Sequence, residues 1–397
     1  MTMTLTGSCT DASVGDTGPV IPEAAAATMR GLDTASEDAL RHSGRQYLAI
    51  GDLTTENSGH LGPVTIAYES WGTLNAAKDN AVLVEHALTG DAHVVGPRGP
   101  GQPSPGWWEG LIGPNAPLDT ERFFVISTNV LGGCMGSTGP SSLAEDGKPY
   151  GSRFPRLTIR DQVAAEIAAV DALGIDTFAA VIGGSMGGMR ALEWTVTAPE
   201  RVRRSVIIAS TAAASADQIA WAAPQIAAIR MDPDFRGGDY YGHATPTAGL
   251  SVARQIAHTT YRTAAELTSR FGRDAQPGED PARGGRYAVE SYLEYHGRKL
   301  VQRFDPNSYL VLTEAMNSHD VGRGRGGVEK ALRQVTADVT VASVDSDRLY
   351  LPSESDRIAA GVARGRPQTL IHSEYGHDGF LVEADQVAAL IRAALAR

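Results

Sequence analysis

Basic residues and long apolar runs are scarce in this sequence, and each shortage argues against a class of protein. The 397 residues include 35 lysines and arginines against 46 acidic residues, so the formal net charge is −11. An acidic surface repels a phosphate backbone, and we therefore expect no nucleic-acid partner. No run of about 18 apolar residues occurs, which argues against a membrane-spanning helix and a membrane partner.

Cysteine is almost absent, since Cys9 and Cys134 are too few for a disulfide framework. A reducing compartment is therefore expected, and the N-terminus lacks the basic start and apolar run of a signal peptide. Both features favour a cytoplasmic protein. Because there is no HExxH or CxxC motif, we expect no metal site and no permanently bound cofactor. We interpret Cys134 as a small buried residue rather than a nucleophile.

The chain divides into three regions by composition and pattern. Residues 1–44 are rich in Thr, Ala, Ser and Gly without a sustained period, which predicts a flexible N-terminal tail or, alternatively, a domain-swapping arm. Residues 45–211 and 335–397 alternate strand-like and helical patterns, which is typical of an α/β core with a mostly parallel sheet. Residues 212–334 lack strand-like runs, and we predict that they form an inserted helical lid over that sheet.

Individual elements follow from hydrophobic periodicity. Short apolar runs bounded by turn residues predict strands, and apolar residues spaced by three and four predict helices. The predicted strands, of which the first two are antiparallel, are 47–50, 64–70, 81–85, 123–127, 178–182, 206–209, 340–344 and 368–372. The predicted helices are 158–173, 186–197 and 384–396 in the core, and 212–230, 250–269 and 286–304 in the insertion.

The sequence GGSMG at residues 183–187 follows a predicted buried strand and opens a predicted helix. This is the context of the G-x-S-x-G nucleophile elbow, a turn so tight that small residues must flank the serine. Such a turn would present the hydroxyl of Ser185 at the carboxyl edge of the sheet. A structural turn packed through its glycines is the alternative interpretation.

A serine nucleophile needs a base within hydrogen-bond reach and a third group that orients the base. In α/β-hydrolases these residues follow in the order Ser, Asp, His. We favour His377, in a glycine-bracketed loop before the last helix, over His372, which ends a strand and is interpreted as structural. We favour Asp347 over Asp345 because it lies further past the end of its strand. A helix cap or a surface charge is the alternative for each aspartate.

Acyl transfer places negative charge on a carbonyl oxygen, so backbone N–H donors must await it. One donor is normally the residue after the nucleophile, here Met186. The other comes from the loop after an early strand, here residues 86–93, in which Leu88 is best placed to donate. We interpret His86 and His93 as residues that shape this loop through hydrogen bonds.

Several further segments, taken together, are far more specific than any single motif. They are HALTGDAH (86–93), NVLGGCMGSTGPSS (129–142), IGGSMGGMRALEW (182–194), ARQIAHTTYR (253–262), VESYLEYHGRKLVQRFDPNSYLVLTEAMNSHD (289–320), DSDRLYLP (345–352) and GHDGFLVE (376–383). On these segments, all of the chain after the tail resembles the homoserine O-acetyltransferases of the α/β-hydrolase superfamily, the first committed enzymes of methionine biosynthesis in many bacteria and fungi.

The resemblance implies an α/β-hydrolase fold in which Ser185 is the nucleophile, His377 the base and Asp347 its orienting acid. It also implies that Arg254 and Asp378 bind the acceptor, which fits the chemistry of a zwitterion: an arginine can fork onto the carboxylate and an aspartate can hold the ammonium. The implied reaction is ping-pong transfer of acetyl from acetyl-CoA, as co-substrate, to the hydroxyl of L-homoserine. In related enzymes the helical lid forms a dimer, so a homodimer is expected.

Other activities remain open on the sequence. A homoserine O-succinyltransferase or a serine O-acyltransferase would share most of these motifs. The same triad would also serve a serine esterase or another hydrolase, and a non-catalytic scaffold is a third alternative.

Overall fold

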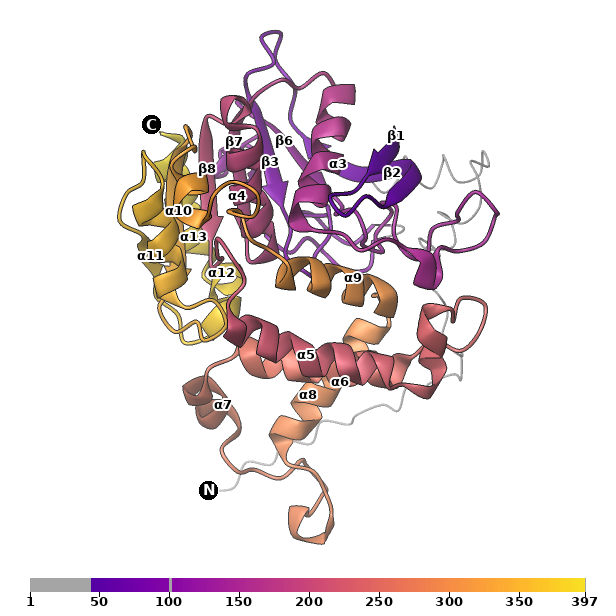
Figure 1. Ribbon diagram of the computed structural model, residues 1–397. Helices are drawn as coiled ribbons and strands as arrows, with labels where there is room; N and C mark the ends of the chain where they lie inside the picture. Colours follow the sequence, from indigo (N-terminus) through magenta and orange to yellow (C-terminus); the bar gives the residue numbers. More distant parts are fainter. Residues whose placement is uncertain (1–43, 100–101, 397) are drawn as a thin grey trace.

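The computed structural model describes residues 44–99 and 102–396, and its centre is an eight-stranded sheet (Figure 1). Strand β2 pairs antiparallel with both β1 and β6, and every pair from β6 to β10 is parallel. In spatial order the strands are β1 (Gln46–Thr54), β2 (His60–Trp71), β6 (Phe124–Thr128), β3 (Ala81–Glu85), β7 (Phe178–Gly184), β8 (Arg204–Ile208), β9 (Asp338–Val344) and β10 (Thr369–Ile371). A separate short pair, β4 (Ile112–Gly113) and β5 (Leu118–Asp119), lies in the loop after β3.

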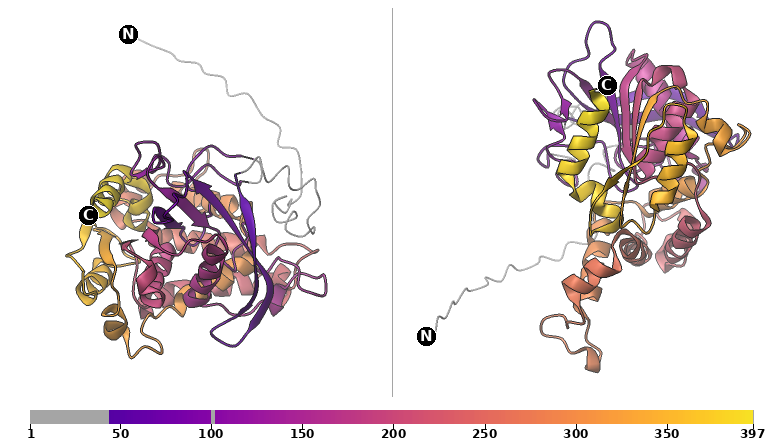
Figure 2. Two further views of the ribbon diagram at one scale, coloured as in Figure 1. Left: turned by 90° about the horizontal axis from the view of Figure 1, so that it is seen from above. Right: turned by 90° about the vertical axis from the view of Figure 1, so that its left-hand side faces the viewer.

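Helices cover both faces of the sheet, as Figure 2 shows. One face packs against α3 (Ile159–Ala172), α4 (Met186–Thr197) and α11 (Pro352–Gly361), and the other against α13 (Ala384–Leu395). A short helix, α12 (Gly379–Val382), precedes α13. The completely buried strands β3 and β7 lie between these layers, which explains why they appear in the sequence as continuous apolar runs.

The predicted core elements agree closely with the structure. Strand β3 and helix α4 have the predicted limits, and α3 lies within one residue of its prediction at each end. The start of α3 is fixed by a capping box, in which the Thr158 side chain accepts from the Asp161 N–H and Asp161 accepts from the Thr158 N–H. The predicted antiparallel start and the mostly parallel sheet that follows it are both confirmed.

Between residues 212 and 334, all of which the structure describes, every helix or strand element is helical, and we call this region the cap. It comprises α5 (Ala216–Arg230), α6 (Thr247–Tyr261), α7 (Ala264–Phe271), α8 (Ala288–Val301), α9 (Pro306–Asn317) and α10 (Val328–Leu332). In Figure 1, α5, α6 and α9 lie across one end of the core, whereas α7 and α8 project away from it.

One cap prediction was wrong in detail, and two cap helices, α9 and α10, were not predicted. The single helix predicted over 250–269 is two helices, because Arg262 is extended and the Thr263 side chain caps a new helix by accepting from the Glu266 N–H at 2.9 Å. Helix α9 was not predicted, although Asp305 at its N-cap and Pro306 at its first turn are typical start signals.

Some expectations fall on residues that the structure does not describe. The predicted tail, except for Gly44, and Cys9 lie outside the described residues. Within the described ranges, none of the helices combines the length and the apolar composition that crossing a membrane requires. The same ranges contain no group of three or more His, Cys, Asp or Glu side chains placed to hold a metal ion.

Candidate active site

Ser185 occupies a strained turn between β7 and α4. Its φ of 58° and ψ of −123° lie outside the regions that non-glycine residues normally adopt, so the surrounding structure must hold the turn in place. Its N–H donates to the Ile208 carbonyl at 2.9 Å, and its carbonyl accepts from the Ser210 hydroxyl at 2.9 Å. The predicted strand–turn–helix context of the elbow is therefore present.

The glycines beside Ser185 are required by close packing. A Cβ atom at Gly184 would lie 2.6 Å from the Phe380 ring, and one at Gly187 would lie 2.1 Å from the Glu85 carbonyl oxygen. Both distances are far inside van der Waals contact, so a larger residue would push helix α4 away from the end of β3. The glycines thus allow the serine to sit beside the loop that follows β3.

A continuous hydrogen-bond chain joins the three residues predicted as a triad. His377 Nε2 lies 2.9 Å from Ser185 Oγ, and His377 Nδ1 lies 2.7 Å from Asp347 Oδ2. The other carboxylate oxygen of Asp347 accepts from the backbone N–H groups of Leu349 and Tyr350 at 2.8 and 3.0 Å. All three residues of the chain are buried, so the imidazole is fixed in orientation between an acid and a hydroxyl.

Asp345 and His372, which were not favoured as triad residues, form a second hydrogen-bonded pair. Asp345 Oδ2 lies 2.8 Å from His372 Nδ1, and the His372 side chain is 75% exposed. This surface pair also ties the ends of β9 and β10 together through the Ser373 N–H, which donates to Asp345. Its exposure and its lack of a hydrogen bond to Ser185 give this pair a structural role.

The pKa of His377 lies above the ordinary value of 6.5. Burial alone would lower this pKa, but the charge and hydrogen bond of Asp347 raise it by more, and the charge of Asp378 acts in the same direction. The imidazolium is therefore favoured at the site, as a general base that collects a proton from a serine requires.

This raised pKa predicts an acid limb in the pH profile. Because only neutral His377 can accept the Ser185 proton, kcat/KM for acyl donor should fall as the pH decreases, with a midpoint above 6.5. Asp378→Asn removes one of the charges that raise the pKa, so its midpoint should move to lower pH. Measuring kcat/KM for acyl donor against pH tests both statements. A wild-type midpoint below 6.5, or an Asp378→Asn midpoint at higher pH, would contradict this account of the electrostatics.

Aromatic rings enclose the imidazole. The ring centroids of Tyr350, Phe380 and Tyr261 lie 5.0, 5.4 and 5.8 Å from that of His377. These rings come from the loop after β9, from α12 and from the end of the cap helix α6. They leave little room for water around the base, which strengthens the electrostatic interactions within the site.

Backbone donors lie on both sides of the serine. Met186 is the first residue of α4, where N–H groups have no partner within the helix, and Leu88 lies in the loop after β3. Among the described residues, neither the Met186 N–H nor the Leu88 N–H is paired with an acceptor. Both residues are buried, so both N–H groups can donate to an oxyanion at a site that is shielded from bulk water.

Buried groups hold the Leu88 loop. His86 Nδ1 lies 2.8 Å from the Ala87 carbonyl oxygen and its Nε2 accepts from the Val130 N–H at 3.1 Å, while burial lowers the pKa of His86 to about 3. His93 is likewise tied down, with Nδ1 2.9 Å from Glu69 Oε2. The structural interpretation of these two histidines therefore agrees with their contacts.

A completely buried ionic network connects the loop to α4, and sequence reasoning missed it. Arg190 of α4 donates to the His86 carbonyl at 3.1 Å and pairs with Glu85 at 2.7 Å and Glu166 at 3.1 Å. Burial raises the pKa of Glu85. A cluster of two acids around one arginine, each far apart in the chain, has no local sequence signature. The network fixes the distance between the helix that carries Met186 and the loop that carries Leu88.

The predicted acceptor-binding residues lie beside the base. Asp378 follows His377 directly, and its Oδ2 pairs with Arg262 Nε at 3.3 Å, a partner that sequence reasoning did not identify. The Arg254 guanidinium lies 5.5 Å above the Tyr261 ring, with Nη1 3.5 Å from Thr89 Oγ1. Arg254 therefore does not pair with Asp378 directly, which leaves the two groups apart, as a zwitterion bound between them would require.

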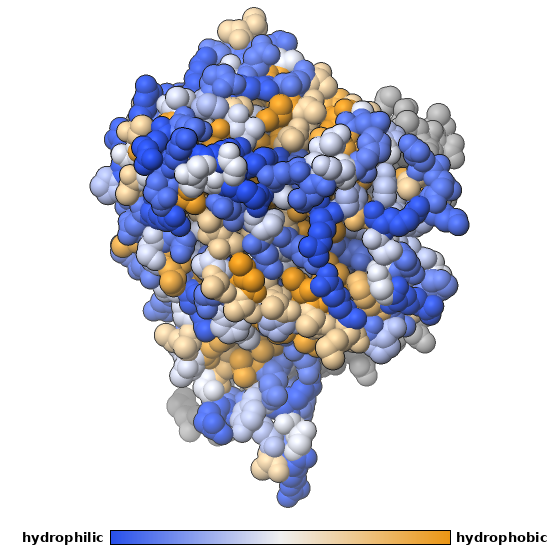
Figure 3. Space-filling model, in the orientation of Figure 1, coloured by the Kyte–Doolittle hydropathy of each residue, from blue (hydrophilic) through white to orange (hydrophobic). Residues whose placement is uncertain are grey.

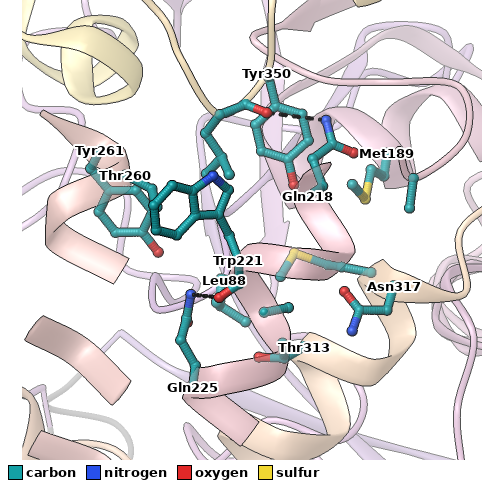
Figure 4. A pocket seen from close by; sticks show the side chains of 14 residues that line it. Leu88, Met189, Gln218, Trp221, Gln225, Thr260, Tyr261, Thr313, Asn317 and Tyr350 are labelled. Carbon is teal, nitrogen blue, oxygen red and sulfur yellow. Dashed lines mark hydrogen bonds between the residues drawn. The ribbon is translucent and has the colours of Figure 1, made fainter. Parts of the chain in front are cut away.

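A pocket leads from the cap to this site (Figure 4). It encloses about 450 Å³ of empty space, part of it open to solvent, between α5, α6 and α9 of the cap and Met189 of α4. Leu88 and the two rings that neighbour His377, Tyr261 and Tyr350, line it together with Trp221 and Gln225 of α5. A ligand in this pocket would therefore contact the same residues that border Ser185 and His377.

Cys134 lies away from the hydrogen-bond chain. Its sulfur accepts from the Asp305 N–H at 3.4 Å, and burial raises the pKa of its thiol to about 12. A thiol that stays protonated is a poor nucleophile, in agreement with the interpretation that Cys134 is not one, although the residue is half-buried rather than buried.

Comparison with known proteins is consistent with this geometry. Residues 80–384 match the family model of the alpha/beta hydrolase fold. The chain is 61% identical to a homoserine O-acetyltransferase from Thermobifida fusca (strain YX) over 356 residues, which cover 89% of this chain and 94% of that protein. The chain belongs to the homoserine O-acetyltransferase family. The resemblance inferred from the sequence segments is thereby confirmed.

Solved structures place this homoserine O-acetyltransferase family member among both transferases and esterases. A crystal structure of homoserine O-acetyltransferase from Bacillus anthracis superposes with a TM-score of 0.82 at 26% identity, covering 89% of this chain and 97% of that one. Esterase E22 superposes with a TM-score of 0.81 at 27% identity, covering 88% and 99% of the two chains. The fold therefore accommodates transfer and hydrolysis, and the acceptor side of the site must distinguish them.

Proposed function

We propose that the protein transfers the acetyl group of acetyl-CoA to the hydroxyl of L-homoserine, giving O-acetyl-L-homoserine and CoA. The observation that carries this proposal is the 61% identity with a homoserine O-acetyltransferase over nearly the whole of both chains. The hydrogen-bond chain from Ser185 through His377 to Asp347 supplies the chemistry. Acetyl-CoA acts as co-substrate, and no permanently bound cofactor takes part in the proposed reaction.

The first half-reaction acylates Ser185. His377 Nε2 accepts the proton of the serine hydroxyl while Oγ attacks the thioester carbonyl carbon. The resulting oxyanion accepts hydrogen bonds from the Met186 and Leu88 N–H groups. When the carbon–sulfur bond breaks, the proton on His377 passes to the departing CoA sulfur, and acetyl-Ser185 remains.

The second half-reaction transfers the acetyl group to the acceptor. Neutral His377 takes the proton of the homoserine hydroxyl, whose oxygen attacks the acetyl carbonyl carbon. The same two N–H groups hold the second oxyanion. When the bond to Ser185 Oγ breaks, the imidazolium returns its proton to the serine, and the enzyme is restored with its product bound.

Transfer must prevail over hydrolysis, because bulk water is present at about 55 M. Ser185 is only 7% exposed, and rings from the cap, from the loop after β9 and from α12 surround His377. The helical cap thus limits the access of water to the acetylated serine. This arrangement favours a transferase over an open esterase.

The acceptor is held at both ends of its zwitterion. In this proposal Asp378 binds the ammonium beside the base, and Arg254 binds the carboxylate with its guanidinium fork. Burial raises the pKa of Asp378, and Arg262, paired with it at 3.3 Å, opposes that effect and orients the carboxylate. The clamp places the acceptor hydroxyl at His377.

Replacing Arg254 with alanine should separate the two half-reactions. Loss of the carboxylate contact should raise KM for homoserine by about 10-fold to 100-fold, because hydrogen bonds to charged groups contribute about 1.5–3 kcal/mol. Acylation by acetyl-CoA alone should be unaffected. Stopped-flow release of CoA without acceptor, compared with steady-state turnover, measures both quantities. Equal loss in both half-reactions would show that Arg254 supports the fold of the site rather than the acceptor.

A thiol-release assay tests the proposed function. CoA released from acetyl-CoA should depend on added homoserine, and the product should be O-acetylhomoserine. Equal release without homoserine would instead support a hydrolase, the activity suggested by the esterase neighbour. Preferential use of succinyl-CoA, or of serine as acceptor, would support the other acyltransferases of this fold.

The proposed reaction also bears on the pathway and the cellular location of the protein. O-Acetylhomoserine places the enzyme in methionine biosynthesis, and we propose a cytoplasmic location.

We also propose a homodimer formed through the cap, where Figure 3 shows apolar side chains gathered over α5 and its neighbours. Ile219, Val252 and Tyr295, from α5, α6 and α8, are 40%, 45% and 53% exposed. Sedimentation velocity of the wild-type chain and of a Val252→Glu variant tests this interface.

A further inference from the structure

Arg303 lies beside the acceptor site without belonging to the predicted clamp. It follows the last turn of α8, and its Nη1 donates to the Thr89 carbonyl at 2.7 Å. Thr89 follows the oxyanion residue Leu88, and its side-chain oxygen lies 3.5 Å from Arg254 Nη1. The two arginines therefore approach the same residue, one from α6 and the other from the end of α8.

These two cations lack the anionic partner that a shielded arginine normally has. Among the described residues, neither Arg254 nor Arg303 has a carboxylate oxygen within 4.0 Å. Burial lowers the pKa of Arg303, the charge of Arg254 lowers it further, and the nearest compensating acid, Asp91, acts only from beyond ion-pair distance. Two arginines that repel each other away from bulk water are stabilised by an anion that both can bind.

Arg254 is the group that links the other two charges of this region, Asp378 and Arg303. Arg254 acts electrostatically on Asp378 at one side and on Arg303 at the other. Asp378 is adjacent to the base, and both arginines approach Thr89, next to the oxyanion residue Leu88. An α-amino acid with a hydroxyl on its side chain presents its hydroxyl, ammonium and carboxylate as separate groups, and its ammonium and carboxylate are complementary to these charges.

We propose that Arg303 is a second receptor for the α-carboxylate of the acceptor, which Arg254 and Arg303 bind together above Thr89. This inference rests on the proposed function and adds a specificity-determining residue to it. It assigns the acceptor class as hydroxy amino acids with a free carboxylate. Alcohols and amino alcohols that lack the carboxylate leave both cations unpaired and are poor acceptors, which also disfavours water.

The test compares two acceptors on a preformed acetyl-enzyme. One is homoserine, and the other is 3-amino-1-propanol, which is homoserine without its carboxylate. The variants are Arg303→Gln, Arg303→Lys and the control Arg298→Gln, which removes an arginine of α8 whose side chain is 62% exposed. Rapid mixing with acetyl-CoA first measures acylation, and each acceptor then discharges the acetyl group.

In the wild type and in Arg298→Gln, homoserine should be strongly preferred over 3-amino-1-propanol. Arg303→Gln should reduce this preference by about 10-fold to 100-fold, the loss of one charge-assisted contact, by slowing discharge to homoserine alone. Acylation should be unchanged, and Arg303→Lys should recover part of the preference because it retains the charge.

Three results would overturn the proposal. Equal slowing of both acceptors, or slowed acylation by acetyl-CoA, would mean that Arg303 only holds the Leu88 loop through Thr89. Selective loss of acylation by succinyl-CoA would mean that Arg303 serves the acyl donor. Failure of the proposed function looks different, because the wild-type acetyl-enzyme would then not transfer its acetyl group to homoserine at all.

Discussion

Replacing Ser185 with alanine should lower the rate of acetyl transfer from acetyl-CoA to homoserine by about 10⁴-fold to 10⁶-fold, the range expected when the nucleophile of a serine triad is removed. Both half-reactions should fail, because no acetyl-enzyme can form without Oγ. The alanine side chain fits the same turn, whose position is held by backbone bonds to Ile208 and by the Ser210 hydroxyl. The variant should therefore fold normally and still bind acetyl-CoA.

A matched control is Ser353→Ala, which removes an exposed serine from α11 and should leave turnover unchanged. The melting temperature and CD spectrum of both variants show whether the fold is retained. Substantial turnover by a well-folded Ser185→Ala variant would mean that another group carries the acetyl, or that homoserine attacks the thioester directly.

Replacing Asp347 with asparagine should lower kcat by about 10⁴-fold while the geometry stays intact, as expected when the acid of a triad loses its charge. The asparagine side chain can still accept from the Leu349 and Tyr350 N–H groups through its carbonyl oxygen. Its amide group would then face His377 Nδ1, which favours the wrong tautomer of the imidazole. The loss should appear in kcat for both half-reactions.

Asp345→Asn provides the matched control, because it removes the same charge two residues away from a histidine pair on the surface. Turnover by this variant should stay at the wild-type level. If instead Asp345→Asn were inactive and Asp347→Asn active, the orienting role would have to be reassigned, and the distance of 2.7 Å between His377 and Asp347 would have no catalytic meaning.

Local sequence patterns were sufficient for the elements that position the nucleophile. Strand β3 and helix α4 are continuous or periodic apolar segments with clear limits, and the glycines at 184 and 187 follow from contacts that any such elbow must make. Because the hydroxyl, the strand and the helix are adjacent in the chain, short-range rules determine their arrangement.

The acid and the base of the triad lie far from Ser185 in the chain, so local patterns around the serine do not identify them. Both aspartates lie just after β9 and both histidines just after β10, and the structure contains two hydrogen-bonded Asp–His pairs rather than one. Position relative to the strand ends favoured the pair beside Ser185, but no periodicity distinguishes a buried pair from an exposed one. Family resemblance, rather than physical reasoning on the sequence, pointed to Arg254 and Asp378.

The remaining features depend on contacts between distant segments. Arg190, Glu85 and Glu166 meet only after the sheet has formed, and Arg262 reaches Asp378 from the link between α6 and α7, more than a hundred residues earlier in the chain. The break between α6 and α7 was predictable, because Thr263 followed by Glu266 is a helix-start pattern. It was missed because the apolar residues over 250–269 follow one continuous amphipathic spacing.

Intact-mass measurement after mixing the wild-type protein with acetyl-CoA alone tests the central claim most directly. The account predicts one added acetyl group, which peptide mapping locates on Ser185 and which disappears when homoserine is added, with O-acetylhomoserine appearing in equal amount. An unmodified protein that nevertheless acetylates homoserine, or an acetyl group on any residue other than Ser185, would contradict it.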